Sequence, residues 1–223
     1  MLLLASDTSG KHGSIALARC EGDNCDVIEV VALAGGTFSA QLVPQIAALL
    51  RKHGFGKQDI GGFAVASGPG SFTGLRVGLA AIKGLAEVLN KPIATVSLLE
   101  AVTMAGCARG RVIAALDAGR SEAYLGEYEV EASEARLIAE RLVSLAELPS
   151  AGATLVTPDL SVAEAARTKG IKVEEVARPD SAAIARLGWQ RIAAGVTVSP
   201  QELDANYIRR SDAEIFAKPA TSL

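Results

Sequence analysis

Apolar and polar residues at the start of the chain alternate in short blocks. Apolar runs cover residues 2–5, 14–19 and 27–33, and polar turns at residues 9–12 and 21–26 separate them. Short apolar runs bounded by Gly, Ser, Asp and Asn are typical of strands joined by turns. The chain is therefore predicted to open with a β-meander.

Two longer segments, residues 39–53 and 74–90, follow the periodicity of α-helices. Apolar side chains occupy one broad arc of the first helix. In the second helix they cover most of the circumference, and the polar side chains share one narrow sector. A helix that covers one sheet needs an apolar stripe of about 100°, so the second helix is predicted to be buried on more than one side.

The second helix therefore has an apolar flank that one sheet does not cover. Either the helix at residues 39–53 covers this flank or another protein does. We predict a partner interface, because exposed apolar patches usually mark interaction surfaces. The predicted interface residues are Leu42, Val43, Ile46, Leu49, Leu50, Leu75, Leu79, Ile82 and Ala86.

The opening pattern returns near residue 111. An apolar run ends at Asp117, as the first run ends at Asp7, and a polar turn and two further predicted strands follow. After these strands, predicted strands and helices alternate again, at residues 154–157, 161–169, 171–176 and 181–194. The chain is predicted to be an α/β protein with two related lobes, each of which opens with a strand, an Asp and a hairpin.

We place an N-terminal lobe at residues 1–105 and a C-terminal lobe at residues 106–223. Two α/β halves of this kind resemble the actin/hexokinase-like ATPase fold, in which the first hairpin approaches nucleotide phosphates and its Asp helps to hold Mg²⁺. The resemblance concerns the fold and implies no activity by itself.

Composition and charge limit the functions open to the chain. Hydrophobic residues make up 49% and aromatic residues 4% of the sequence, which indicates a core of small side chains and closely approaching backbones. The net charge is −3, and no run of Lys or Arg exceeds two residues. Unaided binding of nucleic acid is therefore not expected, because it usually needs a basic surface.

The cysteines and the N-terminus indicate a cytoplasmic protein without membrane association. The three cysteines form no Cys-x-x-Cys motif, so we expect reduced thiols and neither a disulfide framework nor a zinc site. The N-terminus lacks the features of a signal peptide. Residues 30–50 are uncharged but contain Gly, Thr, Ser, Gln and Pro, unlike the roughly 20 predominantly apolar residues of a membrane-spanning helix.

Residues 67–76, with the sequence SGPGSFTGLR, connect a predicted strand to the second helix. Glycine allows close backbone approach, and N–H groups at a helix N-terminus can bind an anion. The alternative is a tight connection in which glycine serves packing only, and both interpretations remain open. The turn is no Walker A loop, because Gly-Lys-Ser/Thr is missing. The candidate anion or nucleotide contacts are Asp7, Gly70, Ser71, Thr73 and Arg76.

No residue is predicted to be catalytic. Histidine occurs only at His12 and His53, so a two-histidine metal motif cannot form and no metal site is expected. Asp7 and Asp117 can coordinate Mg²⁺ through water, but organising a turn is the more ordinary role of such an Asp. The Gly-x-Ser-x-Gly motif of serine hydrolases does not occur.

Several stretches together closely resemble the bacterial TsaB family, also called YeaZ. The most specific is GPGSFTGLR at residues 68–76, which KGLA follows at residues 83–86. The others are LASDTS at 4–9, SIAL at 14–17, Ser39 with LVP at 42–44, VSLLE at 96–100, DA at 117–118 with Arg120, Glu122 and Tyr124, and YIR at 207–209. Their order and spacing also resemble the family, and together they span nearly the whole chain.

The resemblance implies an actin-like fold and a subunit without catalysis of its own. The family is a non-catalytic paralogue of TsaD and forms a heterodimer with it. With the ATPase TsaE, that pair transfers a threonylcarbamoyl group from threonylcarbamoyl-adenylate to an adenosine of certain tRNAs. The expected function is a scaffold or activator that binds and stabilises a TsaD-like catalytic subunit together with a TsaE-like ATPase.

The resemblance also implies what the chain binds. No cofactor is expected in this chain, although ATP or ADP and Mg²⁺ can be present in the complex. The chain meets tRNA only through the complex, and when isolated it can form a homodimer through its first two helices.

Three positions depart from the family pattern: Phe38 stands in place of His, Gly119 in place of Arg and Ala205 in place of Pro. The first is expected to alter partner geometry, and the second puts an anion contact of the turn at residues 117–120 in doubt. Two other functions stay open. One is a small-molecule kinase or ATPase of the same fold, and the other is a metallopeptidase, which the missing histidine pair disfavours.

Overall fold

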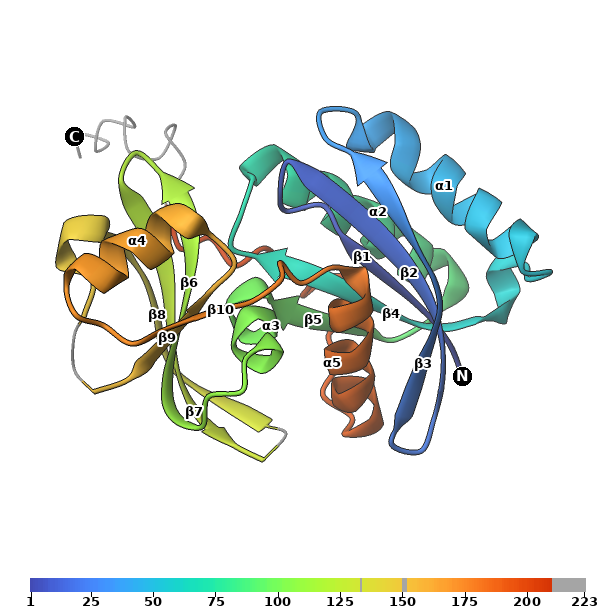
Figure 1. Cartoon of the computed structure of the whole chain (residues 1–223). Coiled ribbons are helices and arrows are strands. Elements are labelled where there is room, and N and C mark those ends of the chain that lie inside the picture. The colour runs from blue at the N-terminus through green and yellow to red at the C-terminus, as the bar shows by residue number, and fades with distance from the viewer. Residues whose placement is uncertain (133, 150–151, 210–223) are drawn as a thin grey trace, which may run out of the picture.

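The structure, a computed structural model, describes residues 1–132, 134–149 and 152–209. Over these residues the chain forms two lobes, each built on a five-stranded mixed sheet with helices packed against it (Figure 1). The C-terminal lobe was predicted to extend to residue 223, and residues 210–223 lie outside the described part.

The first sheet has the strand order β3-β2-β1-β4-β5. Its strands are β1 (Leu2–Asp7), β2 (His12–Glu21), β3 (Asn24–Ala34), β4 (Ile60–Gly68) and β5 (Ile93–Ser97). The first three pair antiparallel, as the predicted meander requires, whereas β4 and β5 join in parallel. Parallel neighbours need crossover connections, and helices α1 (Phe38–Lys52) and α2 (Phe72–Leu89) supply them.

The second sheet repeats this topology, with the order β10-β9-β6-β7-β8. Its elements are β6 (Gly110–Gly119), β7 (Glu122–Glu131), β8 (Glu134–Ser144), β9 (Thr154–Thr157), α4 (Leu160–Thr168) and β10 (Val173–Glu175). In both sheets the first strand lies at the centre, antiparallel to the second strand and parallel to the fourth. The two related lobes of the actin/hexokinase-like fold are therefore confirmed.

The two faces of the first sheet carry side chains of different size, because successive residues of a strand point to opposite faces. Toward α1 and α2 the sheet presents large side chains, among them Leu4, Ile15, Leu17, Phe63 and Val65. Toward α5 (Ser181–Ala193) it presents small ones, among them Ala5, Ala16, Ala18, Ala64 and Ala66. Alanine lets this helix approach closely: a Cβ on Gly188 would lie 2.3 Å from the Cβ of Ala64.

Helices also join the two lobes. Helix α3 (Leu98–Ala105) contacts β6, β7 and β8 of the second sheet as well as β4 and β5 of the first. Helix α5 follows the second sheet in sequence but packs on the first, in the middle of the molecule (Figure 1). A division of the chain at residue 105 therefore separates α5 from the sheet that it covers. Within the described ranges, no helix is long and apolar enough to cross a membrane.

Candidate functional site

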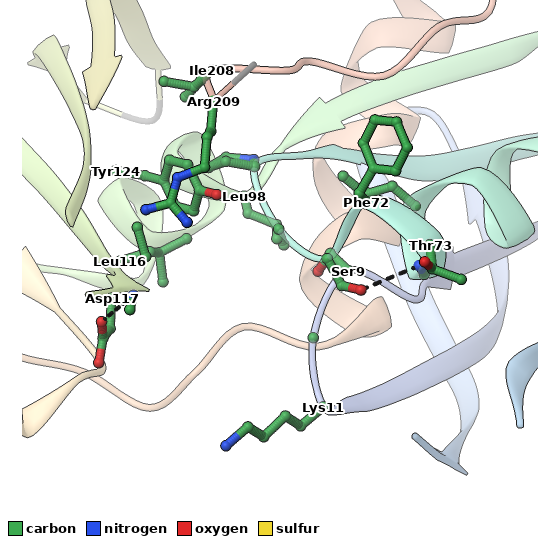
Figure 2. Close-up of a pocket in the computed structure, with 18 of the residues that line it drawn as sticks. Ser9, Lys11, Phe72, Thr73, Leu98, Leu116, Asp117, Tyr124, Ile208 and Arg209 are labelled. Carbon is green, nitrogen blue, oxygen red and sulfur yellow. Dashed lines mark hydrogen bonds between the residues drawn. The ribbon is translucent and has the colours of Figure 1, made fainter. Parts of the chain in front are cut away.

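A cleft with a volume of about 1120 Å³ lies between the two lobes. Figure 2 shows residues of the first lobe, such as Ser9 and Thr73, on one side and Asp117 and Tyr124 of the second lobe on the other. The lining residues come from both hairpin turns, from the Gly-rich turn and from the end of the described chain. Segments that are distant in the sequence thus share one concave surface, where ligands usually bind.

The two Asp residues at the strand ends organise their own turns. The Oδ1 atom of Asp7 accepts hydrogen bonds from the backbone N–H of Ser9 at 2.9 Å and from its hydroxyl at 2.5 Å. The Oδ1 atom of Asp117 accepts one from the backbone N–H of Gly119 at 2.7 Å. A side chain bonded to the N–H two residues on is an Asx turn. The repeat of topology therefore extends to the hydrogen bonds of the two hairpins.

Asp7 is set back from the cleft. Its side chain is buried and lines a smaller cavity of about 240 Å³. Burial raises the pKa of the Asp7 carboxyl above its usual range, although the hydrogen bonds from Ser9 and the charge of Arg178 oppose this. The carboxylate is therefore costly to keep charged, and its hydrogen bonds are used within the turn.

The Gly-rich turn is packed directly on the first hairpin. The N–H of Ser71 donates to the carbonyl of Ser9 at 2.6 Å, and the Ser71 hydroxyl caps α2 by accepting from the N–H of Gly74 at 3.3 Å. A Cβ on Gly70 would lie 2.4 Å from the Ser9 oxygen, and one on Gly74 would lie 2.1 Å from the Thr8 oxygen. Packing against backbone atoms therefore accounts for both glycines.

Some of the predicted anion contacts line the cleft, whereas Arg76 is engaged with aromatic side chains. Gly70, Ser71 and Thr73 line the cleft, but the N–H of Ser71 is already hydrogen-bonded within the chain. The guanidinium carbon of Arg76 lies 3.6 Å from the centre of the Phe72 ring, and its Nε donates to the hydroxyl of Tyr207 at 3.1 Å. An arginine over an aromatic face is attracted to it electrostatically, so Arg76 holds the end of the described chain against α2. Anion binding at these residues remains a prediction.

Residues 203–209, which we call the inter-lobe strap, connect the two lobes along the cleft. The N–H of Asn206 donates to the carbonyl of Ser67 in the first lobe at 2.7 Å, and its side-chain amide donates to Glu140 of the second lobe. Arg209 forms an ion pair with Glu122 of β7, and Figure 2 shows it beside the ring of Tyr124. Of these residues the sequence singled out only Ala205 and the motif YIR at 207–209, so this bridging role was missed.

Sequence reasoning also missed an ion pair at the second hairpin. Asp159, just before α4, accepts the backbone N–H of Asp117 at 2.8 Å and pairs with Arg178 at 2.5 Å. Neither residue belongs to a motif, and only the fold brings them together. Among the residues that the structure describes, no three His, Cys, Asp or Glu side chains are grouped so that they could hold a metal ion.

The structure places most of the predicted partner interface inside the chain, and the contact with a partner stays a prediction. All of its residues except Val43 are buried within the chain, because α1 packs against α2 and both helices share one hydrophobic cluster with the first sheet. The chain itself therefore covers the flank at Leu79 and Ile82. Val43 is 51% exposed and is the member of the set that a partner could reach without rearrangement.

Two departures from the family pattern also have structural explanations. Phe38 is buried at the start of α1, where a Cβ on Gly13 would lie 2.8 Å from its ring. It therefore contributes to the core. Gly119 has a φ of 70°, a backbone conformation that favours glycine over arginine.

Two related α/β lobes, an Asp-bearing hairpin turn in each and a cleft between them define a protein of the actin/hexokinase-like fold class. Residues 32–185 match the family model of TsaD, described as tRNA N6-adenosine threonylcarbamoyltransferase. The chain belongs to this family, and its relatives place it in the TsaB/YeaZ branch.

The relatives support this placement over different lengths. TsaB of Bacillus subtilis is 36% identical over 132 residues, which are 58% of this chain and 56% of that protein. TsaB of Haemophilus influenzae is 35% identical over 57% of this chain and 53% of its own length. The chain thus spans about half the length of these relatives. An uncharacterised protein of Mycobacterium tuberculosis is 27% identical over 96% of this chain and 95% of its own.

Solved structures agree with the described fold. A protein of Pseudomonas aeruginosa described as similar to peptidase YEAZ is 26% identical, with a TM-score of 0.77 over 93% of this chain and 99% of that one. YeaZ of the same organism is 24% identical, with a TM-score of 0.74 over 92% and 100% of the two chains, and this likeness concerns the fold alone.

Proposed function

We propose that the chain acts in the biosynthesis of threonylcarbamoyladenosine in tRNA, as a scaffold or activator subunit without catalysis of its own. The observation that carries the proposal is the family membership together with relatives named as TsaB biosynthesis proteins. The proposed partners are a TsaD-like catalytic subunit and a TsaE-like ATPase, and tRNA is met through their complex.

The hydrogen bonds around the cleft support a structural role for the residues that would carry nucleotide chemistry in an active member of the fold. Asp7 and Asp117 bond to their own turns, and the N–H of Ser71 bonds to Ser9. The bonds from Ser9 to Asp7 are buried, so breaking them would leave buried polar atoms unpaired. Together with the bonds of the other two turns they form a rigid frame. A rigid frame suits a subunit whose surface has to fit a partner.

Reconstitution tests the proposal. Threonylcarbamoyl transfer to tRNA is measured with threonylcarbamoyl-adenylate, a TsaD-like and a TsaE-like protein, with this chain present, omitted or added after heat denaturation. We expect no transfer by this chain alone and transfer by the full set. Equal transfer in the full set and in the set without this chain would show the proposal to be wrong.

The exposed surface of α1 is the proposed place of contact with the TsaD-like partner. Val43→Asp is expected to weaken co-purification with that partner at least tenfold, because an unpaired charge is costly to bury in an interface. Leu160→Asp is the matched control: Leu160 is 66% exposed and lies on α4 in the other lobe. Equal binding by both variants would exclude a contact at Val43.

A kinase or ATPase of the same fold is the second candidate, and the observation that favours it is the large cleft lined by both hairpin turns. Titration calorimetry of the isolated chain with ATP and Mg²⁺ distinguishes the two functions. Micromolar binding with turnover would favour the ATPase and count against the scaffold.

A further inference from the structure

Cys20 and Cys25 face each other across the first hairpin of the fold. They are register partners in the antiparallel pair of β2 and β3, and their sulfur atoms are 2.8 Å apart. Both are free thiols in the structure. We propose that this pair is a modification site at which oxidation forms an intramolecular disulfide. The proposal is independent of the proposed function.

The backbone at Cys20 suits such a bond. Its N–H and carbonyl are both paired with Met1 on the other side of β2, at 2.9 and 2.6 Å, so they do not bond to β3. Cys20 and Cys25 are therefore a non-hydrogen-bonded pair, in which the Cα atoms of antiparallel strands come closest, at about 4.5 Å. Disulfides span Cα distances of about 4.4–6.8 Å, and the sulfur atoms need to approach by less than about 1 Å to reach bonding distance.

The two thiols differ in access, which gives them different roles. Cys25 is partly exposed, whereas Cys20 is fully buried. Reagents in solution therefore reach Cys25 first, and Cys20 resolves the product. Cys107, which is exposed, has neither cysteine as a register partner and serves as an internal control.

A low-molecular-weight disulfide, such as oxidised glutathione, is a sufficient oxidant. The Cys25 thiolate attacks one sulfur of the oxidant, forms a mixed disulfide and releases one thiolate. The Cys20 thiolate then attacks the Cys25 sulfur and releases the second thiolate. Two electrons pass to the oxidant, and the two protons lost by the cysteines end on the two released thiols.

The surroundings predict a bond that forms slowly and persists. Burial raises the pKa of both thiols, so few are deprotonated near neutral pH and attack is slow. The raised pKa also makes each sulfur a poor leaving group, which protects the finished disulfide from exchange. The bond would also stabilise the corner where the indole N–H of Trp189 donates to the carbonyl of Gly22 at 2.9 Å.

Peptide mapping tests the proposal on the folded chain. The protein is incubated with oxidised glutathione in mildly alkaline buffer, its remaining thiols are alkylated after denaturation, and it is digested with trypsin. Residues 20–51 form one peptide that contains both cysteines and excludes Cys107. We expect this peptide to lack two hydrogen atoms and to carry no alkyl group, and we expect Cys107→Ser to give the same result.

Cys25→Ser is the test variant, and its peptide is expected to carry an alkyl group on Cys20. If circular dichroism shows that this variant does not fold, the melting temperature of the wild type is measured instead. The melting temperature should rise by roughly 4–9 °C on oxidation and return to its first value on reduction. Alkylation of both cysteines in the oxidised wild type, or a stable glutathione adduct on Cys25, would overturn the proposal.

Discussion

Replacing Ile82 by Ala tests whether the apolar flank of α2 belongs to the chain's own core. The Ile82 side chain is fully buried, in the cluster that α1, α2 and the first sheet share. The substitution removes three buried carbon atoms, at about 0.8 kcal/mol each. The transfer contribution is therefore about 2.4 kcal/mol, and the cavity left behind brings the expected loss to about 2.4–5 kcal/mol.

Urea unfolding followed by circular dichroism measures this loss. With a slope of about 1–3 kcal/mol per M of urea, the midpoint should fall by roughly 1 M or more while the slope stays unchanged. The measurement is made at several protein concentrations, because dimerisation would make the apparent stability depend on concentration.

Val43→Ala is the matched control for Ile82→Ala. Val43 lies on the neighbouring helix and is 51% exposed, so its truncation should change the stability by no more than about 0.5 kcal/mol. A loss below about 1 kcal/mol for Ile82→Ala, or a larger loss for Val43→Ala, would refute the argument that α1 covers this flank.

Four further substitutions test the packing of α2 and the charges of two buried carboxyl groups. Gly74→Ala should lower the free energy of unfolding by about 1–3 kcal/mol, because the added Cβ meets a backbone oxygen. Gly84→Ala, in the open part of α2, should instead raise the free energy of unfolding by about 0.5–1 kcal/mol. Thermal unfolding measures both changes. Asp7→Asn should stabilise the chain at pH 7, and the gain should vanish below the ordinary pKa of 3.8, because the raised pKa of Asp7 makes its charge unfavourable in the fold. Glu127→Gln should destabilise the chain at pH 7 and match the wild type in acid. Arg111 lowers the pKa of Glu127, and the stability that the ionised carboxylate provides is lost as the pH falls through that lowered pKa. Urea titrations at several pH values measure both pH effects.

The pH profiles of Asp7→Asn and Glu127→Gln have opposite signs, so each serves as a control for the other. If both variants lost stability at pH 7, the Asp7 carboxylate would be a net stabilising group and the argument from its burial would be wrong. A Gly74→Ala variant as stable as Gly84→Ala would mean that the turn can relax away from the hairpin.

Local patterns in the sequence predicted the elements closely. The strand at residues 154–157 was predicted with its observed bounds, and α1 and α2 with ends within two residues. Such success is expected where a period of two or of 3.6 residues persists over a whole element. The strand predicted at residues 171–176 is shorter in the structure, at Val173–Glu175.

The candidate site was only partly predictable. Residues 67–76 and both strand-ending Asp residues were identified, and they do border the space between the lobes or support it. Arg178 and Asp159 were missed because each is ordinary in its local sequence, and the contact between them depends on where β9 and the segment before α5 lie. The contact of Arg76 with Phe72 is local, since both residues lie on α2. The hydrogen bond of Arg76 to Tyr207 instead joins residues that the second lobe separates in the sequence.

Local periodicity and motifs of adjacent residues were enough to predict the succession of strands and helices along the chain, the repeat of the strand–Asp–hairpin and the family. The tertiary structure brings together surfaces that no local pattern pairs. It placed α1 over the flank of α2, α5 on the alanine face of the first sheet and the inter-lobe strap between the lobes. An apolar stripe specifies that a surface must be covered, but what covers it depends on contacts between residues far apart in the chain.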